Sequence, residues 1–204
     1  GSNTLTLANA SGTYSGVMSG TGGLTVSGGA VTLSGANTYT GPTTVSGGTL
    51  DISSYSDTVG AVTLSSGSIT GTTGTLTGTS YAVTNNSGTT TISAKLGGSG
   101  TLTKTNNGTL ELSGSSSSYS GDVVVSDGTV KVSHANALGD ATGTTLVSSG
   151  ATLDLDGVNV ASESVTLAGG TLTDTSSTLG GNVTLTGNST LGAGSGNTLN
   201  ITGT

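Results

Sequence analysis

A repeated segment is the feature that most constrains how this chain can fold. Residues 35–53 read GANTYTGPTTVSGGTLDIS, and residues 119–133 read YSGDVVVSDGTVKVS. With an offset of 80 residues, six positions match: Tyr39 with Tyr119, Gly41 with Gly121, Val45 with Val125, Gly48 with Gly128, Leu50 with Val130, and Ile52 with Val132. An internal repeat of this kind indicates a stack of similar units, so we interpret the chain as a repeat architecture.

Each unit predicts two short strands and two turns. Gly41-Pro42 is a turn signal, because proline fixes φ and glycine tolerates positive φ. The β-branched run at 43–45 predicts a strand, and Gly47-Gly48 predicts a second turn. Residues 49–52 then alternate polar and apolar side chains, which is typical of a half-buried strand.

Similar strand signals recur along the whole chain, about every 8–12 residues, without a helical period. That spacing alone also fits a β-sandwich or an up-and-down barrel. The strands are unusually short, the five tyrosines are the only aromatic residues, and the sequence repeats itself. These features favour an all-β fold, a parallel β-helix (solenoid), with roughly nine or ten rungs of two or three strands each.

The composition fits a narrow core better than a wide one. Glycine accounts for 38 of the 204 residues, only 6% are charged, and apolar residues come a few at a time between glycine turns. A solenoid can bury such residues rung against rung. We expect Leu50, Ile52, Val130 and Val132 to point inward with the other Leu, Val and Ile. The Thr, Ser and Asn between them are expected to face solvent.

The charge and cysteine content exclude several classes of protein. A formal net charge of −7 and only three basic residues, Lys95, Lys104 and Lys131, argue against nucleic-acid binding. The absence of cysteine excludes a disulfide framework and CxxC motifs. No apolar run reaches the 18 residues of a membrane helix. Residues 1–2 do not start a signal peptide, and we interpret them as a cloning remnant before a single β-helical unit at 3–204.

Residues 11–53 resemble the autotransporter-associated β-strand repeat of bacterial type V secreted proteins. The segment from LGGSGTLTKTNNGTLELSG to VKVSHANALGD (96–140) is similar to a second, looser copy, in which Asp122 replaces the proline and Asp127 the first glycine of the Gly-Gly pair. The repeat copies thus lie near 22–53 and 99–133. Residues 146–157, LVSSGATLDLDG, are similar to the segment that often follows such a repeat.

This resemblance implies a right-handed β-helical passenger region that is secreted and displayed on the bacterial cell surface. It implies an adhesin-like scaffold or stalk that supports folding and secretion, and no enzyme. The implied partners are a C-terminal translocator barrel outside this chain and an unknown host or surface ligand of the parent protein. We therefore expect a piece of a longer protein. Neither Asn3–Leu7 nor Leu199–Thr204 looks like a polar cap, so we also expect end-to-end self-association.

Two groups of side chains have the residue types of a reactive site. Ser133, His134 and Asp140 supply the residue types of a hydrolase triad, but no nucleophile elbow surrounds them, which indicates a loop histidine. Asp154 and Asp156, at i and i+2, would lie about 7 Å apart on one strand face, as paired acids or calcium ligands. No second acidic strand in matching phase is evident, so we interpret them as solvated acids.

Two further patterns bear on function. The glycine runs at 20–23 and 97–100 have no P-loop lysine and open no helix, which excludes phosphate binding. Two threonines flank a leucine at 4–6, 75–77, 101–103 and 171–173, and such triplets would form a threonine ladder if they stacked. An ice-binding solenoid and a carbohydrate-active β-helix are thus the alternatives to a scaffold. We expect no catalytic, cofactor-binding or metal-binding residues.

Overall fold

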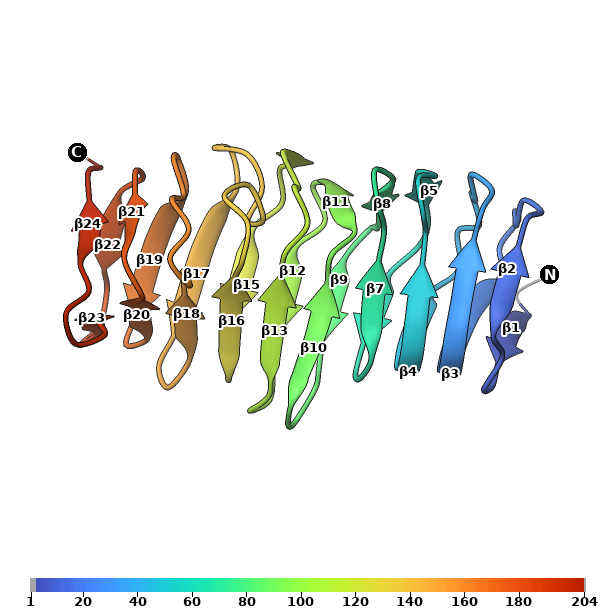
Figure 1. Ribbon diagram of the computed structural model, residues 1–204, viewed down its shortest axis with the longest axis horizontal. Helices are drawn as coiled ribbons and strands as arrows, with labels where there is room; N and C mark the ends of the chain where they lie inside the picture. Colours follow the sequence, from blue (N-terminus) through green and yellow to red (C-terminus); the bar gives the residue numbers. More distant parts are fainter. Residues whose placement is uncertain (1–2, 204) are drawn as a thin grey trace.

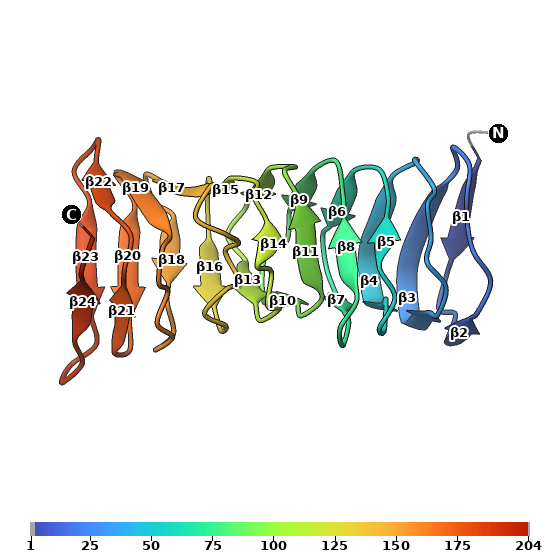
Figure 2. The ribbon, with the colours of Figure 1, turned by 90° about the horizontal axis from the view of Figure 1, so that it is seen from above.

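The structure, a computed structural model that describes residues 3–203, is a rod of parallel strands coiled into about ten turns, without helices (Figure 1). The first and last turns lie at opposite ends of the rod (Figures 1 and 2). The predicted all-β parallel solenoid is therefore confirmed. Residues 1–2, interpreted above as a cloning remnant, lie outside the described residues. Each turn of the solenoid is called a rung below.

Every complete rung contributes strands to up to three faces. The strands of the first face, in the order in which they pair, are β1 (Thr4–Leu7), the first half of β3 (Gly23–Leu33), the first half of β4 (Thr43–Asp51), β6 (Val62–Leu64), β9 (Tyr81–Val83), β12 (Leu102–Lys104), β15 (Val123–Val125), β17 (Thr144–Ser148), β19 (Ser164–Ala168) and β22 (Val183–Leu185). All these pairings are parallel and in register, so equivalent residues of successive rungs stack directly on one another.

The second face is built in the same way beside the first. Its strands are β2 (Gly12–Tyr14), the second halves of β3 and β4, β7 (Ser68–Thr70), β10 (Thr89–Ile92), β13 (Thr109–Leu112), β16 (Thr129–Val132), β18 (Thr152–Asp154), β20 (Thr171–Asp174) and β23 (Thr190–Ala193). The third face holds β5 (Asp57–Thr58), β8 (Thr75–Thr77), β11 (Lys95–Gly98) and β14 (Ser118–Tyr119), then the separate pair β21 (Ser177–Leu179) and β24 (Leu199–Ile201).

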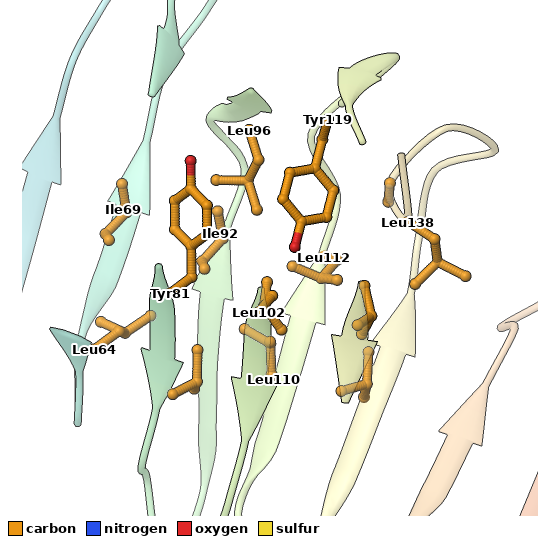
Figure 3. Packing of buried hydrophobic residues seen from close by; sticks show 14 of the residues in the cluster. Leu64, Ile69, Tyr81, Ile92, Leu96, Leu102, Leu110, Leu112, Tyr119 and Leu138 are labelled. Carbon is orange, nitrogen blue, oxygen red and sulfur yellow. The ribbon is translucent and has the colours of Figure 1, made fainter. Parts of the chain in front are cut away.

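One continuous apolar core runs along the rod. Leu50, Ile52, Val130 and Val132 are all buried in it, as predicted. Figure 3 shows the middle of this core, where Tyr81 and Tyr119 project between aliphatic side chains. Their rings are in edge-to-face contact, with centroids 5.8 Å apart. The Tyr81 hydroxyl donates to the Leu76 carbonyl at 2.8 Å, so a large aromatic residue is buried without an unsatisfied polar group.

The glycine turn between the first and second faces is fixed by close contact between rungs. Gly48 has φ of +70°, and a Cβ there would lie 2.2 Å from the carbonyl oxygen of Gly29 in the preceding rung. Gly128, its counterpart in the second copy, has φ of +68°. Asp127 replaces Gly47, which does not have a positive φ. The looser copy therefore keeps glycine only where the backbone requires it.

The expectation that Thr, Ser and Asn face solvent was wrong for several residues. The buried polar or charged side chains are Asn37, Thr43, Asp57, Asn85, Thr90, Lys104, Ser116, Thr145, Glu163, Asp174 and Ser177. Most of them bond to backbone groups or to one another at the corners between faces. The hydroxyl of Thr43, for example, lies 2.6 Å from that of Tyr39. Such partners offset the cost of removing polar groups from water, which composition alone does not reveal.

The core is open at both ends of the described region. Leu5, Tyr14 and Val17 are exposed in the first rung, and Leu185 and Leu191 are exposed in the last. Residues at the same inward positions of the middle rungs are buried, because a rung covers them on each side.

Burial within the stack predicts a contrast between two leucines. Leu50 is 1% exposed, and Leu50→Ala should lower the free energy of unfolding by about 2–5 kcal/mol, because it leaves a cavity between two rungs. Leu185, 61% exposed on the first face, is the matched control, and its replacement by alanine should cost less than about 1 kcal/mol. Urea denaturation of both variants measures the difference. Equal costs would contradict the assigned inward position of Leu50.

Candidate functional site

Charge is concentrated in the middle of the rod. Seven of the ten acidic residues lie in residues 111–163, here called the charged section: Glu111, Asp122, Asp127, Asp140, Asp154, Asp156 and Glu163. Among the described residues, no strand of the third face lies between β14 and β21. Loops at 133–143 and 155–163 cover the core there instead, and each buries an apolar side chain of its own, Leu138 or Val160. The charged section thus coincides with an interruption of the third face (Figure 2).

A charged column crosses the second face within this section. Glu111 pairs in register with Lys131, and Lys131 pairs with Asp154 in the next rung. The Lys131 ammonium lies 2.9 Å from a carboxylate oxygen of Asp156, and this contact raises the pKa of Lys131. The prediction that no acidic strand shares the phase of Asp154 was therefore wrong, since Glu111 lies in the same column two rungs earlier. Lysine lies between the acids and reduces their repulsion.

Asp154 and Asp156 do not project side by side from one strand. Strand β18 ends at Asp154, and Asp156 lies in the following turn with φ of +49°. The backbone N–H of Asp156 donates to the Asp154 carboxylate at 3.0 Å. One acid therefore stabilises the turn, and the other pairs with Lys131. Within residues 3–203, no group of His, Cys, Asp and Glu has the arrangement of a metal site.

Ser133, His134 and Asp140, which supply the residue types of a hydrolase triad, bond to different partners. The hydroxyl of Ser133 donates to Glu111 at 3.0 Å and lies 3.3 Å from Asp156. Nδ1 of His134 accepts the N–H of Asn136, and Asp140 accepts from Thr142. The bonds of His134 and Asp140 stabilise local turns, and those of Ser133 join neighbouring rungs. They do not join the three side chains into a proton relay.

The glycine runs lie in the stacked scaffold. Gly97 and Gly98 end strand β11, and a Cβ at Gly97 would lie 2.7 Å from the methyl group of Thr75 in the rung before. Gly20 lies in the turn before β3 with φ of +95°. Close packing and turn geometry thus account for these glycines.

The four Thr-Leu-Thr triplets do not stack into a ladder. They lie in β1 and before and within β12 on the first face, in β8 on the third and in β20 on the second. The first face does carry an outward threonine column that the triplets did not predict: Thr6, Thr25, Thr44 and Thr63 pair in register. Ala82, Val124 and Leu146 interrupt its continuation. The regular ladder considered for ice binding is therefore not formed.

Lys104 is a buried charge that sequence reasoning missed. It occupies an inward position between Val83 and Val125, and its ammonium donates to the carbonyl oxygens of Thr105 at 2.7 Å and Asn106 at 2.5 Å. Burial lowers its pKa, and the charge of Asp127 acts in the opposite direction. The match of the 102–104 strand with the 24–26 strand could have revealed it, because that match places Lys104 at the position of Val26.

A second buried polar group lies under the third face near the N-terminal end. The backbone N–H and the side-chain amide of Asn37 donate to one oxygen of Asp57, at 2.7 and 2.9 Å. The other carboxylate oxygen of Asp57 is buried without a partner. Burial raises the pKa of Asp57, although the hydrogen bonds from Asn37 lower it. No local sequence signal identifies this pair, since the two residues lie on successive rungs.

Comparison with known proteins was decisive for the repeats. Residues 28–52 and 102–132 match the family model of the passenger-associated-transport-repeat. These two segments match passenger repeats, which confirms the resemblance predicted from the sequence. Over 82 residues the chain is 42% identical to the adhesin BmaC autotransporter of Brucella suis biovar 1 (strain 1330), a match that covers 40% of this chain and 2% of the adhesin. No solved structure matches the chain.

The two passenger repeats occupy equivalent parts of the solenoid. The first spans the second half of β3 and all of β4, and the second spans β12 to β16. Each contains the positive-φ glycine at the corner between the first and second faces. Residues 3–203 contain no helix of the length and apolarity needed to cross a membrane.

The buried carboxyl of Asp57 predicts a specific pH dependence. Because its pKa is higher in the folded than in the unfolded chain, its contribution to stability is present at low pH and is lost as the pH rises through the folded value. Asp57→Asn removes this component, so its unfolding free energy should fall less than that of the wild type between about pH 4 and about pH 7.5. Urea denaturation at both pH values measures it, and Asp127→Asn at an exposed turn controls for the lost charge. Identical pH profiles of wild type and Asp57→Asn would contradict the prediction.

Proposed function

We propose that this passenger segment is a structural scaffold or stalk, and that its stepwise folding supports secretion of the protein to which it belongs. The observation that carries the proposal is the single apolar core, held by in-register backbone pairing through about ten rungs. Each rung contacts mainly its neighbours, so a folded rung is a template for the next. Folding can therefore progress along the chain as it emerges from the cell.

The composition supports the same proposal. The chain has no cysteine that could oxidise during export, and 6% charged residues leave few strong ion pairs to form before a rung closes. The positive-φ glycines supply turns that need no partner from outside their own and adjacent rungs. Such a chain is suited to transport in an extended state followed by local folding.

Passenger repeats belong to polypeptides that are secreted or displayed at the cell surface, and the relative is named an adhesin. Our proposal extends to a parent protein that is held at the outer membrane by its own C-terminal translocator and contacts a host or surface ligand. The chain spans 2% of the length of the adhesin it matches. Adhesion by the parent protein is therefore a part of our proposal.

A display experiment tests the scaffold role. The chain is placed between an epitope tag and an autotransporter translocator, and the protease-resistant tag on whole cells is measured. Val45→Asp puts a charge into the core without a partner and should strongly reduce resistant surface tag. Thr44→Asp, the outward neighbour, should leave it near the wild-type level. Equal display of both variants would contradict a role of rung folding in secretion.

We also propose that the segment has no enzymatic activity of its own. The side chains of Ser133, His134 and Asp140 bond to separate partners, which supports this proposal. A panel of polysaccharides and esters should show no turnover above background. Turnover that disappears in Asp154→Asn or His134→Ala would overturn the proposal.

The apolar faces of the first and last described rungs support a further proposal, that the 204-residue polypeptide associates end to end. Leu5, Val17 and Leu185 are exposed there, and the terminal strands β1 and β22 have unpaired backbone groups on one side. Light scattering should show an apparent mass that rises with concentration, and hydrogen exchange should be fastest in the terminal rungs. A monomer at all concentrations, protected evenly to both ends, would contradict the proposal.

A further inference from the structure

The strands of the first and last rungs pair on one side only. These strands are β1 and β2 at the N-terminal end of the rod and β22, β23 and β24 at the C-terminal end (Figure 1). Within residues 3–203, each of them pairs only with a strand of the adjacent inner rung. Their outer edges therefore offer backbone N–H and C=O groups to one more parallel strand.

Backbone bonds between inner rungs show how such edges fit together. On the first face, the N–H of Leu24 donates at 2.9 Å to the carbonyl of Pro42, the residue before the next member of its column. Val183 continues this column into the last rung, and Leu5 begins it in the first. The Val183 N–H and the carbonyl of Thr4, the residue before Leu5, are thus the donor and acceptor that a further rung would join.

The inward residues of the second face differ in size between the two ends. Gly12 and Tyr14 are the inward residues of β2, and they pair with buried residues of β3. Leu191 and Ala193 are the inward residues of β23, and they pair with buried residues of β20. A Cβ at Gly12 would meet no atom within 4 Å, so space is open beside it. Stacking β23 on β2 would place a large residue against a small one at both positions.

The N-terminal end also forms an apolar hollow. A cavity of about 210 Å³ there is lined by residues that include Leu5, Leu7 and Met18. At the opposite end, Leu185 and Leu191 are 61% and 49% exposed. The equivalent side chains of the inner rungs are buried by the rung that follows. Each end therefore presents the kind of surface that the inner rungs bury against one another.

Side-chain charge does not oppose contact between the ends. All ten acidic residues, the three lysines and the histidine lie between Asp51 and Asp174. Residues 1–50 and 175–204 carry no charged side chain, although the formal net charge of the chain is −7. Repulsion between two acidic rods is therefore concentrated along their sides, and contact through the ends avoids most of it.

Only one arrangement of two rods continues the stack. Contact between like ends reverses the strand direction of one copy and lays the second face of one copy over the third face of the other. Contact between unlike ends keeps all strands parallel, as in the strand pairs inside the rod. Such a contact is heterologous, so each copy retains a free end and the assembly lengthens without closing.

We propose that the C-terminal end of one copy docks on the N-terminal end of a second copy, with β22 paired to β1 and β23 to β2. On the first face, Thr184 then meets Thr6 and Leu185 meets Leu7, so the inward and outward columns continue from rod to rod. This inference rests on the end-to-end association proposed above and adds which ends meet and in which register. The product is a filament with one continuous core.

Disulfide trapping tests this register. The chain has no cysteine, so Thr6→Cys and Thr184→Cys each introduce a single thiol at an exposed position of a terminal strand. Docking in register brings the two residues to the spacing of paired strands, about 4.8 Å, which a disulfide can span. When the two variants are mixed with oxidised glutathione, the mixed dimer should form about tenfold faster than either homodimer.

Two further variants are the controls. Thr58→Cys, exposed on the third face away from both ends, gives the rate of random encounters when it is mixed with Thr6→Cys. The pair of Thr6→Cys and Thr184→Cys should exceed this rate about tenfold. Leu185→Asp, added to the Thr184→Cys chain, places a charge on the docking surface at an exposed position, so it should return cross-linking to the random rate.

Three outcomes would overturn the register: homodimers as the main products, mixed dimers at the random rate, or cross-linking that Leu185→Asp leaves unchanged. Light scattering of the same samples without oxidant shows separately whether end-to-end association occurs. A mass that rises with concentration alongside homodimers would overturn only the orientation, and a monomer at all concentrations would overturn the association as well. The display experiment with Val45→Asp depends on neither result, so the scaffold role is tested separately.

Discussion

The parallel hydrogen bonds between successive rungs are the interaction on which the rest of this structure depends. They hold each strand in register with the strand before and after it, so a residue at one position stacks on its equivalents along the rod. The residues at one inward position therefore meet similar apolar surroundings in each of the roughly ten rungs. Short strands of Val, Leu and Ile meet this demand, and the corner glycine at positions such as Gly48 lets the backbones of adjacent rungs approach closely.

The same stacking decides how polar groups are tolerated inside. A polar residue in an inward column needs a partner within its own or an adjacent rung, because nothing else can reach it. Thr43 has Tyr39, Lys104 has the carbonyl groups that follow it, and Asn37 has Asp57. Asp57 retains one oxygen without a partner, and its raised pKa reflects that cost. The inward columns are therefore mostly apolar, and the few polar residues in them bond to groups at the corners.

A rod whose rungs depend mainly on their neighbours can absorb local irregularity. The third face stops after β14 and resumes at β21, while the first and second faces continue without interruption. Most of the acidic residues lie in or beside this interruption. The strands on the other two faces maintain the stack there, which leaves the loops free to vary in sequence and charge. The rod therefore combines two continuous strand stacks with one section that is covered by loops.

The sequence by itself determined the repeat and the strand and turn positions within it. It also identified inward residues such as Leu50 and Val132. Period-2 alternation and glycine turns are local properties, so they can be recognised without the structure. The sequence also indicated the passenger repeats, through a long ordered motif. Only the tertiary structure decided which residues meet across rungs. Glu111 and Asp154 share a column, Asn37 reaches Asp57, and Glu163 reaches Thr145, because the number of residues in each rung varies and sets the register. That number depends on loops such as 133–143, whose length follows no local rule, so contacts between rungs could not be derived from spacing alone.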